Sequence, residues 1–88
     1  MKITKEQQEQ IVNFGVFEYN SKKIASILSV NENEIKTEIA EPNSELSKLL
    51  QKGKDMADYV IDLKLFNMAK EGDMKALDKL EYRKRLRE

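Results

Sequence analysis

The chain has no cysteine and no histidine among its 88 residues. These absences exclude disulfide bonds, thiolate and imidazole metal sites, the thiol nucleophile and the commonest general base. A serine or a carboxylate could still react, but the usual activating partner of a serine is missing. We therefore expect a protein that is not an enzyme and that uses no metal ion or cofactor.

Helix-breaking residues are also scarce, with one proline and three glycines. Together with 36% charged and 40% hydrophobic residues, this composition favours charged-surface helices over a β-sandwich. No apolar run approaches the roughly 18 residues of a membrane span, and the opening MKITKEQQEQ lacks the apolar core of a signal peptide. We expect one small all-α domain, soluble and cytoplasmic.

An excess of charge of either sign is missing too, because 16 basic residues balance 16 acidic ones. The segments 1–19, 20–41 and 42–74 each have a small acidic excess, whereas residues 75–88 carry six basic and three acidic side chains. The net charge of the whole chain therefore neither favours nor excludes a polyanionic partner.

What the chain does contain, over residues 20–39, is two short helical patterns separated by a tight turn. Asn20 or Ser21 is expected to cap the first helix and Asn31 the second. Ser29 begins the turn, where glycine is favoured because it accepts a positive φ without strain. The predicted buried residues are Ile24, Ala25, Leu28, Val30, Ile35 and Ile39.

This order of elements is that of a helix-turn-helix. An ordinary corner between two helices fits the same pattern, but the spacing from Ala25 through Val30 to Ile35 favours the DNA-reading motif. If Ile35 points inward, Asn33 and Thr37 point away from the core. Asn is suited to adenine and Thr to a thymine methyl or a phosphate. The candidate DNA-binding residues are Lys22, Lys23, Asn33, Lys36 and Thr37.

A solvated polar face is the alternative interpretation of these residues, since four glutamates on or next to the same helix would repel phosphates. They are Glu32, Glu34, Glu38 and Glu41. A single copy should therefore bind DNA weakly, because phosphate neutralisation supplies most of the affinity. An oligomer that presents several copies would compensate through effective concentration.

On either side of this motif the sequence predicts further helices. Thr4 with Gln7 forms a capping box that starts a helix near Lys5. The aromatic residues that end this helix, Phe14, Phe17 and Tyr19, are expected in the core. Pro42 ends the third helix, so we place a helix-turn-helix unit over residues 1–41 and a helical hairpin over residues 42–88, continuous with it as one small domain.

The hairpin begins with the longest pattern of the chain, residues 45–71, in which only Gly53 interrupts the helix. Gly53 allows a close backbone approach or marks a bend. Gly72 and Asp73 end this helix and start the next. Met74, Leu77 and Leu80 are expected to face inward, and the charged tail EYRKRLRE to fray.

The apolar surface of the long helix exceeds what the shorter last helix can cover, so we expect self-association through it. The tail adds a basic cluster of Arg83, Lys84, Arg85 and Arg87. Such a cluster either complements the negative end of a helix or contacts phosphate.

From residue 18 to residue 80 the order of features resembles the small terminase subunits of tailed bacteriophages and prophages. The likeness is carried by Tyr19-x-Ser21, Ile24-Ala25-x-x-Leu28, Pro42-x-Ser44, the long helix with Gly53, and Ala69-x-x-Gly72-Asp73-x-x-Ala76 followed by Leu77 and Leu80. Order and spacing carry it, and the Gly72-Asp73-x-x-Ala76 hairpin is its most specific part.

The resemblance implies a helix-turn-helix that binds the packaging site on viral DNA, and a hairpin that drives ring-like oligomers. It also implies a partner, the large terminase subunit, which is the ATPase and nuclease, and a bacterial host cytoplasm. The DNA-binding role falls on the five residues named above. The oligomerisation role falls on Leu49, Leu50, Met56, Val60 and Phe66.

Two other functions fit the sequence. A small helix-turn-helix transcription regulator would be a dimer on a palindromic site, whereas a packaging subunit would form larger rings. A helical protein-interaction module without nucleic acid is favoured by the zero net charge and the acidic third helix.

Overall fold

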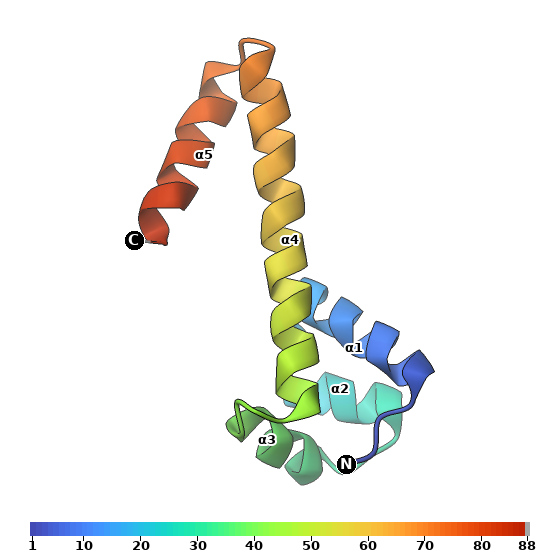
Figure 1. Cartoon of the computed structure of the whole chain (residues 1–88). Helices are drawn as coiled ribbons and strands as arrows, with labels where there is room; N and C mark the ends of the chain where they lie inside the picture. The colour runs from blue at the N-terminus through green and yellow to red at the C-terminus, as the bar shows by residue number, and fades with distance from the viewer. Residues whose placement is uncertain (88) are drawn as a thin grey trace. The chain divides into compact units, whose positions relative to one another are not determined.

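The computed structural model of the protein describes residues 1–87. Over these residues it consists of five α-helices and no strand, so the all-α prediction is confirmed (Figure 1). The helices are α1 (Lys5–Phe17), α2 (Ser21–Leu28), α3 (Glu32–Ala40), α4 (Glu45–Lys70) and α5 (Met74–Leu86).

Each helix starts where a nearby side chain can accept a hydrogen bond from a free backbone amide of the first turn. Thr4 and Gln7 form the predicted capping box of α1. Asn20, Asn31 and Asp73 cap α2, α3 and α5 as predicted. At the start of α4, the Ser44 hydroxyl accepts a hydrogen bond of 3.1 Å from the Ser47 amide.

The ends of the helices follow from backbone conformation. α3 ends at Ala40, because Glu41 before Pro42 is extended, with φ −100° and ψ 105°. Ser29 after α2 is left-handed, with a φ of 57°, at the position where glycine is favoured. Gly72 between α4 and α5 has a φ of 101°, which a side chain would strain.

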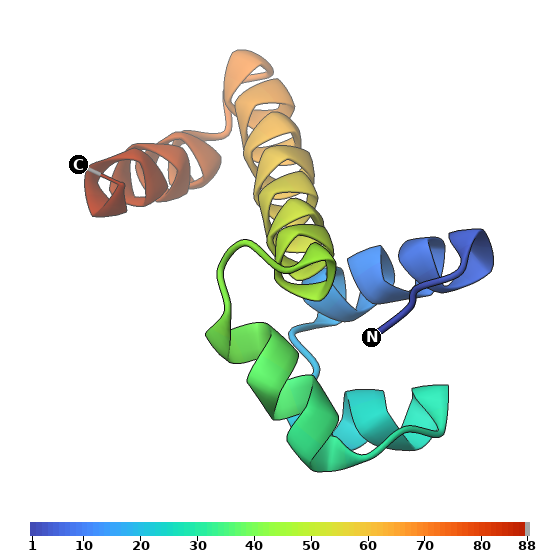
Figure 2. The same ribbon diagram turned by 60° about the horizontal axis from the view of Figure 1, so that its bottom comes forward.

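The chain divides into an N-terminal unit, Met1–Met56, and a C-terminal unit, Ala57–Glu88. The division falls inside α4 rather than after residue 41, so the first half of α4 belongs with α1, α2 and α3 (Figure 2). The reason is packing: Leu46 of α4 is fully buried in the same core as Ile24 and Ile35.

The core of the N-terminal unit contains most of the apolar residues predicted for it. Its buried members are Ile11, Phe14, Ile24, Ala25, Ile35 and Leu46, and Ile3, Tyr19, Leu28, Val30, Leu49 and Leu50 pack against them. The prediction that Val30 of the turn enters the core is therefore confirmed.

Two residues expected in this core are exposed instead, so those predictions were wrong. Phe17 is 59% exposed and Ile39 is 39% exposed. Each lies in the last turn of a helix, where fewer neighbouring elements cover a side chain than at the middle. Helical periodicity identifies the apolar face of a helix, but it does not show at which residue the neighbouring element stops packing against that face.

Two glycines permit α1 and α4 to cross at very short distance. Gly15 and Gly53 are both buried. A Cβ on Gly53 would overlap the carbonyl oxygen of Val12, and a Cβ on Gly15 would overlap that of Leu50. The close approach predicted as one role of Gly53 is confirmed, and α4 continues through it from Glu45 to Lys70.

The C-terminal unit consists of the second half of α4 and of α5, which runs back along it (Figure 1). Ala76 is buried, and Leu77 and Leu80 are half-buried. Met74 is 65% exposed, so its predicted inward position was wrong. α5 extends to Leu86, through most of the tail that was predicted to fray.

Candidate nucleic-acid interface

A nucleic-acid site in the N-terminal unit would lie on the helix pair α2 and α3. The two helices pack on each other and are joined by residues 29–31. The Val30 amide donates a hydrogen bond of 3.0 Å to the Ala25 carbonyl, which closes the end of α2. Ile24 and Ile35, one from each helix, are fully buried. Their burial fixes which faces of α2 and α3 point outward.

The five candidate DNA-binding residues are all exposed on this unit. They are Lys22 and Lys23 in the first turn of α2, and Asn33, Lys36 and Thr37 on α3. At 100° per residue, Asn33 and Thr37 lie on the side of α3 that faces away from buried Ile35, and Lys36 flanks them. The arrangement on α3 is therefore the one that the sequence predicts.

Several of these side chains already have intramolecular partners. The Thr37 hydroxyl donates a hydrogen bond of 2.8 Å to the Asn33 carbonyl, so its methyl group and oxygen lone pairs are left for a ligand. Lys36 Nζ lies 3.8 Å from Glu32, and both side chains are largely exposed. Lys23 Nζ lies 4.2 Å from the centre of the Tyr19 ring. Exposed contacts of these kinds are weak, so a phosphate could compete for both lysines.

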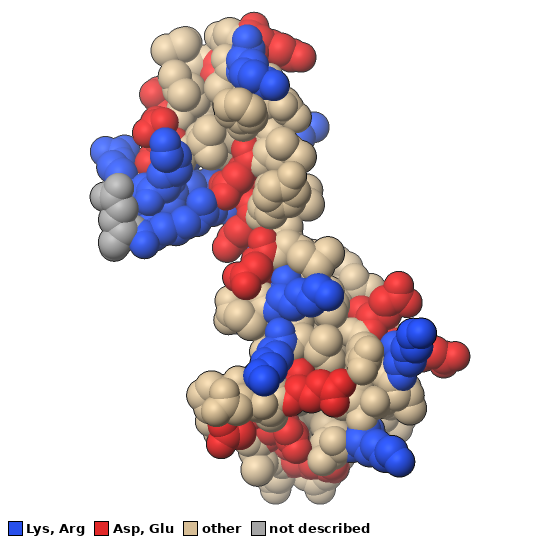
Figure 3. All heavy atoms as spheres, in the orientation of Figure 1, with Lys and Arg blue, Asp and Glu red and all other residues tan. Residues whose placement is uncertain are grey.

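Charge on the N-terminal unit is mixed rather than concentrated. Figure 3 shows lysines interspersed with acidic side chains over the visible face of this unit. Glu34 and Glu41 are exposed at the two ends of α3. Because nearby carboxylates offset the lysines, long-range attraction to DNA would be small, and affinity would depend on direct contacts.

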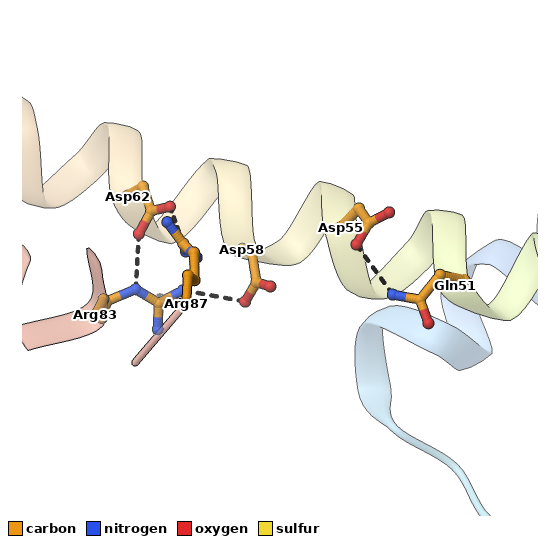
Figure 4. A network of polar contacts seen from close by, with 6 residues as sticks. All are labelled: Gln51, Asp55, Asp58, Asp62, Arg83 and Arg87. Atoms are coloured by element: carbon orange, nitrogen blue, oxygen red, sulfur yellow. Dashed lines mark hydrogen bonds and ion pairs between the residues drawn. The ribbon is translucent and has the colours of Figure 1, made fainter. Parts of the chain in front are cut away.

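Two basic residues of the C-terminal cluster, Arg83 and Arg87, are paired with aspartates of α4 within the C-terminal unit (Figure 4). Arg83 Nε donates a hydrogen bond of 2.7 Å to Asp62, and Arg83 Nη2 donates one of 3.0 Å to Asp58. Arg87 Nη2 donates a bond of 2.6 Å to Asp62. These four side chains join α5 to α4, so Arg83 and Arg87 are structural residues of the hairpin.

The same network shifts the ionisation of its central pair. The hydrogen bond from Arg83, assisted by Arg87, holds the pKa of Asp62 below its ordinary value. The hydrogen bond to Asp62 raises the pKa of Arg83. Of the other two basic residues in the cluster, Lys84 lies 3.3 Å from Glu81, and Arg85 forms no ion pair within residues 1–87.

The five candidate oligomerisation residues separate into two groups. Leu49 and Leu50 are half-buried against the core of the N-terminal unit, so their apolar surface is largely used there. Met56, Val60 and Phe66 are 48–63% exposed. Only the second group has surface left for a partner.

Three exposed apolar residues of α4 and one ion-pair network did not enter the sequence-based site. Tyr59, Ile61 and Leu63 are exposed on α4. The spacing of Tyr59, Leu63 and Phe66, four residues and then three, was the available signal. The sequence also held a signal for the network. Asp58 and Asp62 are four residues apart and so share one face of their helix, and Arg83 and Arg87 have the same spacing.

No protein-family model, curated protein or solved structure matches the chain. Within residues 1–87, no group of three or more acidic side chains is placed to hold a metal ion. No helix in that part of the chain combines the length and the hydrophobicity of a transmembrane segment.

Proposed function

We propose that the chain is a non-catalytic DNA-binding protein of phage genome packaging, similar to the small terminase subunits, which binds duplex DNA and self-associates. The observation that carries this proposal is the outward face of α3. Asn33 and Thr37 are exposed there, opposite fully buried Ile35, and exposed Lys36 flanks them.

In this proposal α2, the turn and α3 act as a helix-turn-helix, with α3 in the major groove. The Asn33 amide would read an adenine edge, and Thr37 a thymine methyl or a phosphate. Lys22 and Lys23, in the first turn of α2, would contact the DNA backbone. The positive end of the α2 dipole adds a small attraction for the same phosphate.

Self-association completes the proposed function because one copy offers few cationic contacts. Four glutamates lie on or next to α3, and Lys36 is paired with one of them, Glu32. Several linked copies would bind one DNA molecule far more tightly than one copy. The further partner would be the large ATPase-nuclease subunit of the packaging machine.

Two other functions are kept as alternatives. A helix-turn-helix transcription regulator would use the same face of α3 but would form a dimer on a palindromic site. A helical interaction module without nucleic acid is favoured by the mixed charges on the N-terminal unit (Figure 3). The number of copies in the assembly distinguishes the transcription regulator from the proposed packaging protein. Binding to DNA distinguishes the interaction module from both.

The test is a titration of labelled duplex DNA at low salt with the whole chain and with a charge-reversed variant. In the variant Lys22, Lys23 and Lys36 are changed to Glu. Because lysine–phosphate contacts supply most of the affinity, we expect the variant to bind at least about tenfold more weakly. Fluorescence anisotropy gives the two dissociation constants.

A matched control changes Lys48, Lys52 and Lys54 to Glu. These three lysines are exposed on α4 in the same unit, so the change in net charge is identical. The control should bind DNA much more tightly than the first variant. Absence of binding by the unmodified chain, or equal weakening by both variants, would contradict the proposal.

A further inference from the structure

Three aromatic side chains form a run from the core of the N-terminal unit to its surface. Phe14 is buried, Tyr19 is half-buried and Phe17 is 59% exposed. The centres of the Phe14 and Tyr19 rings are 5.7 Å apart, and those of the Phe17 and Tyr19 rings are 5.4 Å apart. Lys23 lies against Tyr19. We call Phe17, Tyr19 and Lys23 the aromatic corner.

The backbone between α1 and α2 holds the rings of this corner in place. Glu18 is left-handed, with a φ of 58°, and its amide donates a hydrogen bond of 3.3 Å to the Gly15 carbonyl. The Tyr19 amide then donates a bond of 3.1 Å to the Phe14 carbonyl, which keeps Tyr19 at the end of α1. Tyr19 in turn supports Phe17 on one side. A ring that is held before binding loses little conformational entropy when a ligand stacks on it.

The charge at the aromatic corner is positive. Lys23 Nζ is 4.2 Å from the centre of the Tyr19 ring, and Lys22 precedes it in the same turn of α2. Both lysines are exposed. Between residues 17 and 23 the one acidic side chain is that of Glu18, which is also exposed, so two positive charges stand against one negative charge. The corner therefore combines an exposed aromatic ring with an excess of cationic side chains.

Phe66, the other exposed phenylalanine of the chain, lacks part of this combination. It is 48% exposed, but Lys70 Nζ lies over its ring, 4.7 Å from the centre. In the aromatic corner the cation lies over Tyr19 instead, and within residues 1–87 no lysine lies over the ring of Phe17. A planar ligand could therefore stack on Phe17 without first displacing a lysine.

We infer that the aromatic corner binds an unpaired nucleotide of single-stranded DNA, with the base stacked on Phe17 and the phosphate near Lys22 and Lys23. A nucleotide matches the corner because it joins a flat aromatic base to an anionic phosphate. Aromatic side chains next to basic ones are the usual means by which proteins bind single strands. The inference goes beyond the proposed function, because a base inside duplex DNA is stacked between its neighbours and is not accessible to Phe17.

The experiment compares two fluorescent probes at low salt, by anisotropy with the whole chain. One is an oligothymidylate of about six nucleotides, which is short enough for one copy. The other is an oligomer of the same length without bases. Because both carry the same charge, their difference in affinity reports stacking of the base. We expect the oligothymidylate to bind about tenfold more tightly, which is within the effect of one base–aromatic stack.

Two substitutions of Phe17 test the assignment of this stack. Phe17→Leu keeps an apolar side chain but removes the ring, so it should abolish the preference for the oligothymidylate. Phe17→Tyr keeps a ring and should retain the preference. The matched control is Tyr82→Leu, since Tyr82 is 57% exposed on the basic helix α5. It should bind both probes as the unmodified chain does. Circular dichroism of each variant verifies that the helices form.

Equal binding of the two probes by the unmodified chain would overturn the inference. A preference that survives Phe17→Leu, or that is lost equally in Tyr82→Leu, would also overturn it. In each of these cases the titration of duplex DNA with the charge-reversed variant is unaffected, because that variant leaves Phe17 in place. Failure of this inference can therefore be distinguished from failure of the proposed function.

Discussion

At the scale of single residues, the close approach of the α1 and α4 backbones depends on two glycines, which have a hydrogen atom in place of a side chain. Gly15 and Gly53 each have a neighbouring backbone carbonyl where a Cβ would lie. Backbone atoms cannot move aside as a flexible side chain can. A methyl group at either position must therefore push α1 and α4 apart, which loosens the packing of Leu46 and Leu50 against the core.

We predict that Gly53→Ala destabilises the N-terminal unit by about 1–3 kcal/mol, the usual cost of overpacking. The sign is informative, because in an unobstructed helix alanine would be about 1 kcal/mol better than glycine. Urea denaturation followed by circular dichroism measures the change. Lys54→Ala, at an exposed neighbouring position, is the control and should have little effect. An unchanged or more stable Gly53→Ala protein would show that the helices do not cross so closely.

A second residue-scale prediction concerns the turn between α2 and α3. Ser29 has a φ of 57°, a conformation that costs a side-chain-bearing residue roughly 1–2 kcal/mol. Ser29→Gly should remove part of this cost and stabilise the protein by about 0.5–1 kcal/mol. The matched change Ser26→Gly, at an exposed position inside α2, should destabilise it by a similar amount. Thermal unfolding of both variants tests the left-handed turn, and a less stable Ser29→Gly protein would contradict it.

At the scale of elements, the helix boundaries were predictable because they depend on neighbouring residues. Thr4, Asn31 and Asp73 cap the helices that follow them, and Pro42 ends the one before it. The burial of individual side chains was less predictable. Phe17 and Met74 have the right periodicity for the core but are exposed, because burial depends on where a second element ends.

The candidate site likewise has a part that could be predicted from the sequence and a part that could not. The exposure of Asn33 and Thr37 could be predicted from one buried neighbour, Ile35, on a short helix. The roles of Arg83 and Arg87 were missed, because the sequence puts the two arginines on one helical face and two aspartates on another but does not show that these faces meet. A pairing between residues more than twenty positions apart requires the hairpin itself.

That hairpin network should make the attachment of α5 depend on pH. Because the pKa of Asp62 is held below its ordinary value, its contribution to stability is fully present above about pH 4, where aspartate normally titrates. The contribution is lost as pH falls through the lower pKa of the folded state. Asp62→Asn should therefore lower the thermal stability at pH 7 by up to about 1 kcal/mol, and the difference from the unmodified chain should shrink toward pH 2.

The control for this prediction is Asp55→Asn. Asp55 accepts a hydrogen bond of 3.0 Å from Gln51 in its own helix and has no arginine partner (Figure 4). At pH 7, the Asp55→Asn substitution should change the melting temperature less than Asp62→Asn does. A difference between Asp62→Asn and the unmodified chain that is constant from pH 7 to pH 2 would mean that the ionised network does not hold α5.

At the scale of the whole molecule, DNA binding and self-association are expected to reinforce each other. A face with few lysines and several glutamates binds weakly in one copy, and linked copies bind together. Val60→Glu, at a position of α4 that is 63% exposed, should therefore lower the affinity for a long duplex by about tenfold while leaving a duplex with room for one copy nearly unaffected. Anisotropy titrations with the two duplexes measure this, and an equal loss on both would contradict the linkage.

The proposed function depends on α2 and α3 as the surface that meets DNA. The most direct measurement is nuclear magnetic resonance of the uniformly ¹⁵N-labelled chain during addition of a short duplex at low salt. We predict that the amide signals that move most are those of residues 21–23 and 33–37, with small changes in α5. Signals that move chiefly in residues 83–87, or no movement at DNA concentrations well above that of the protein, would contradict DNA binding through α2 and α3.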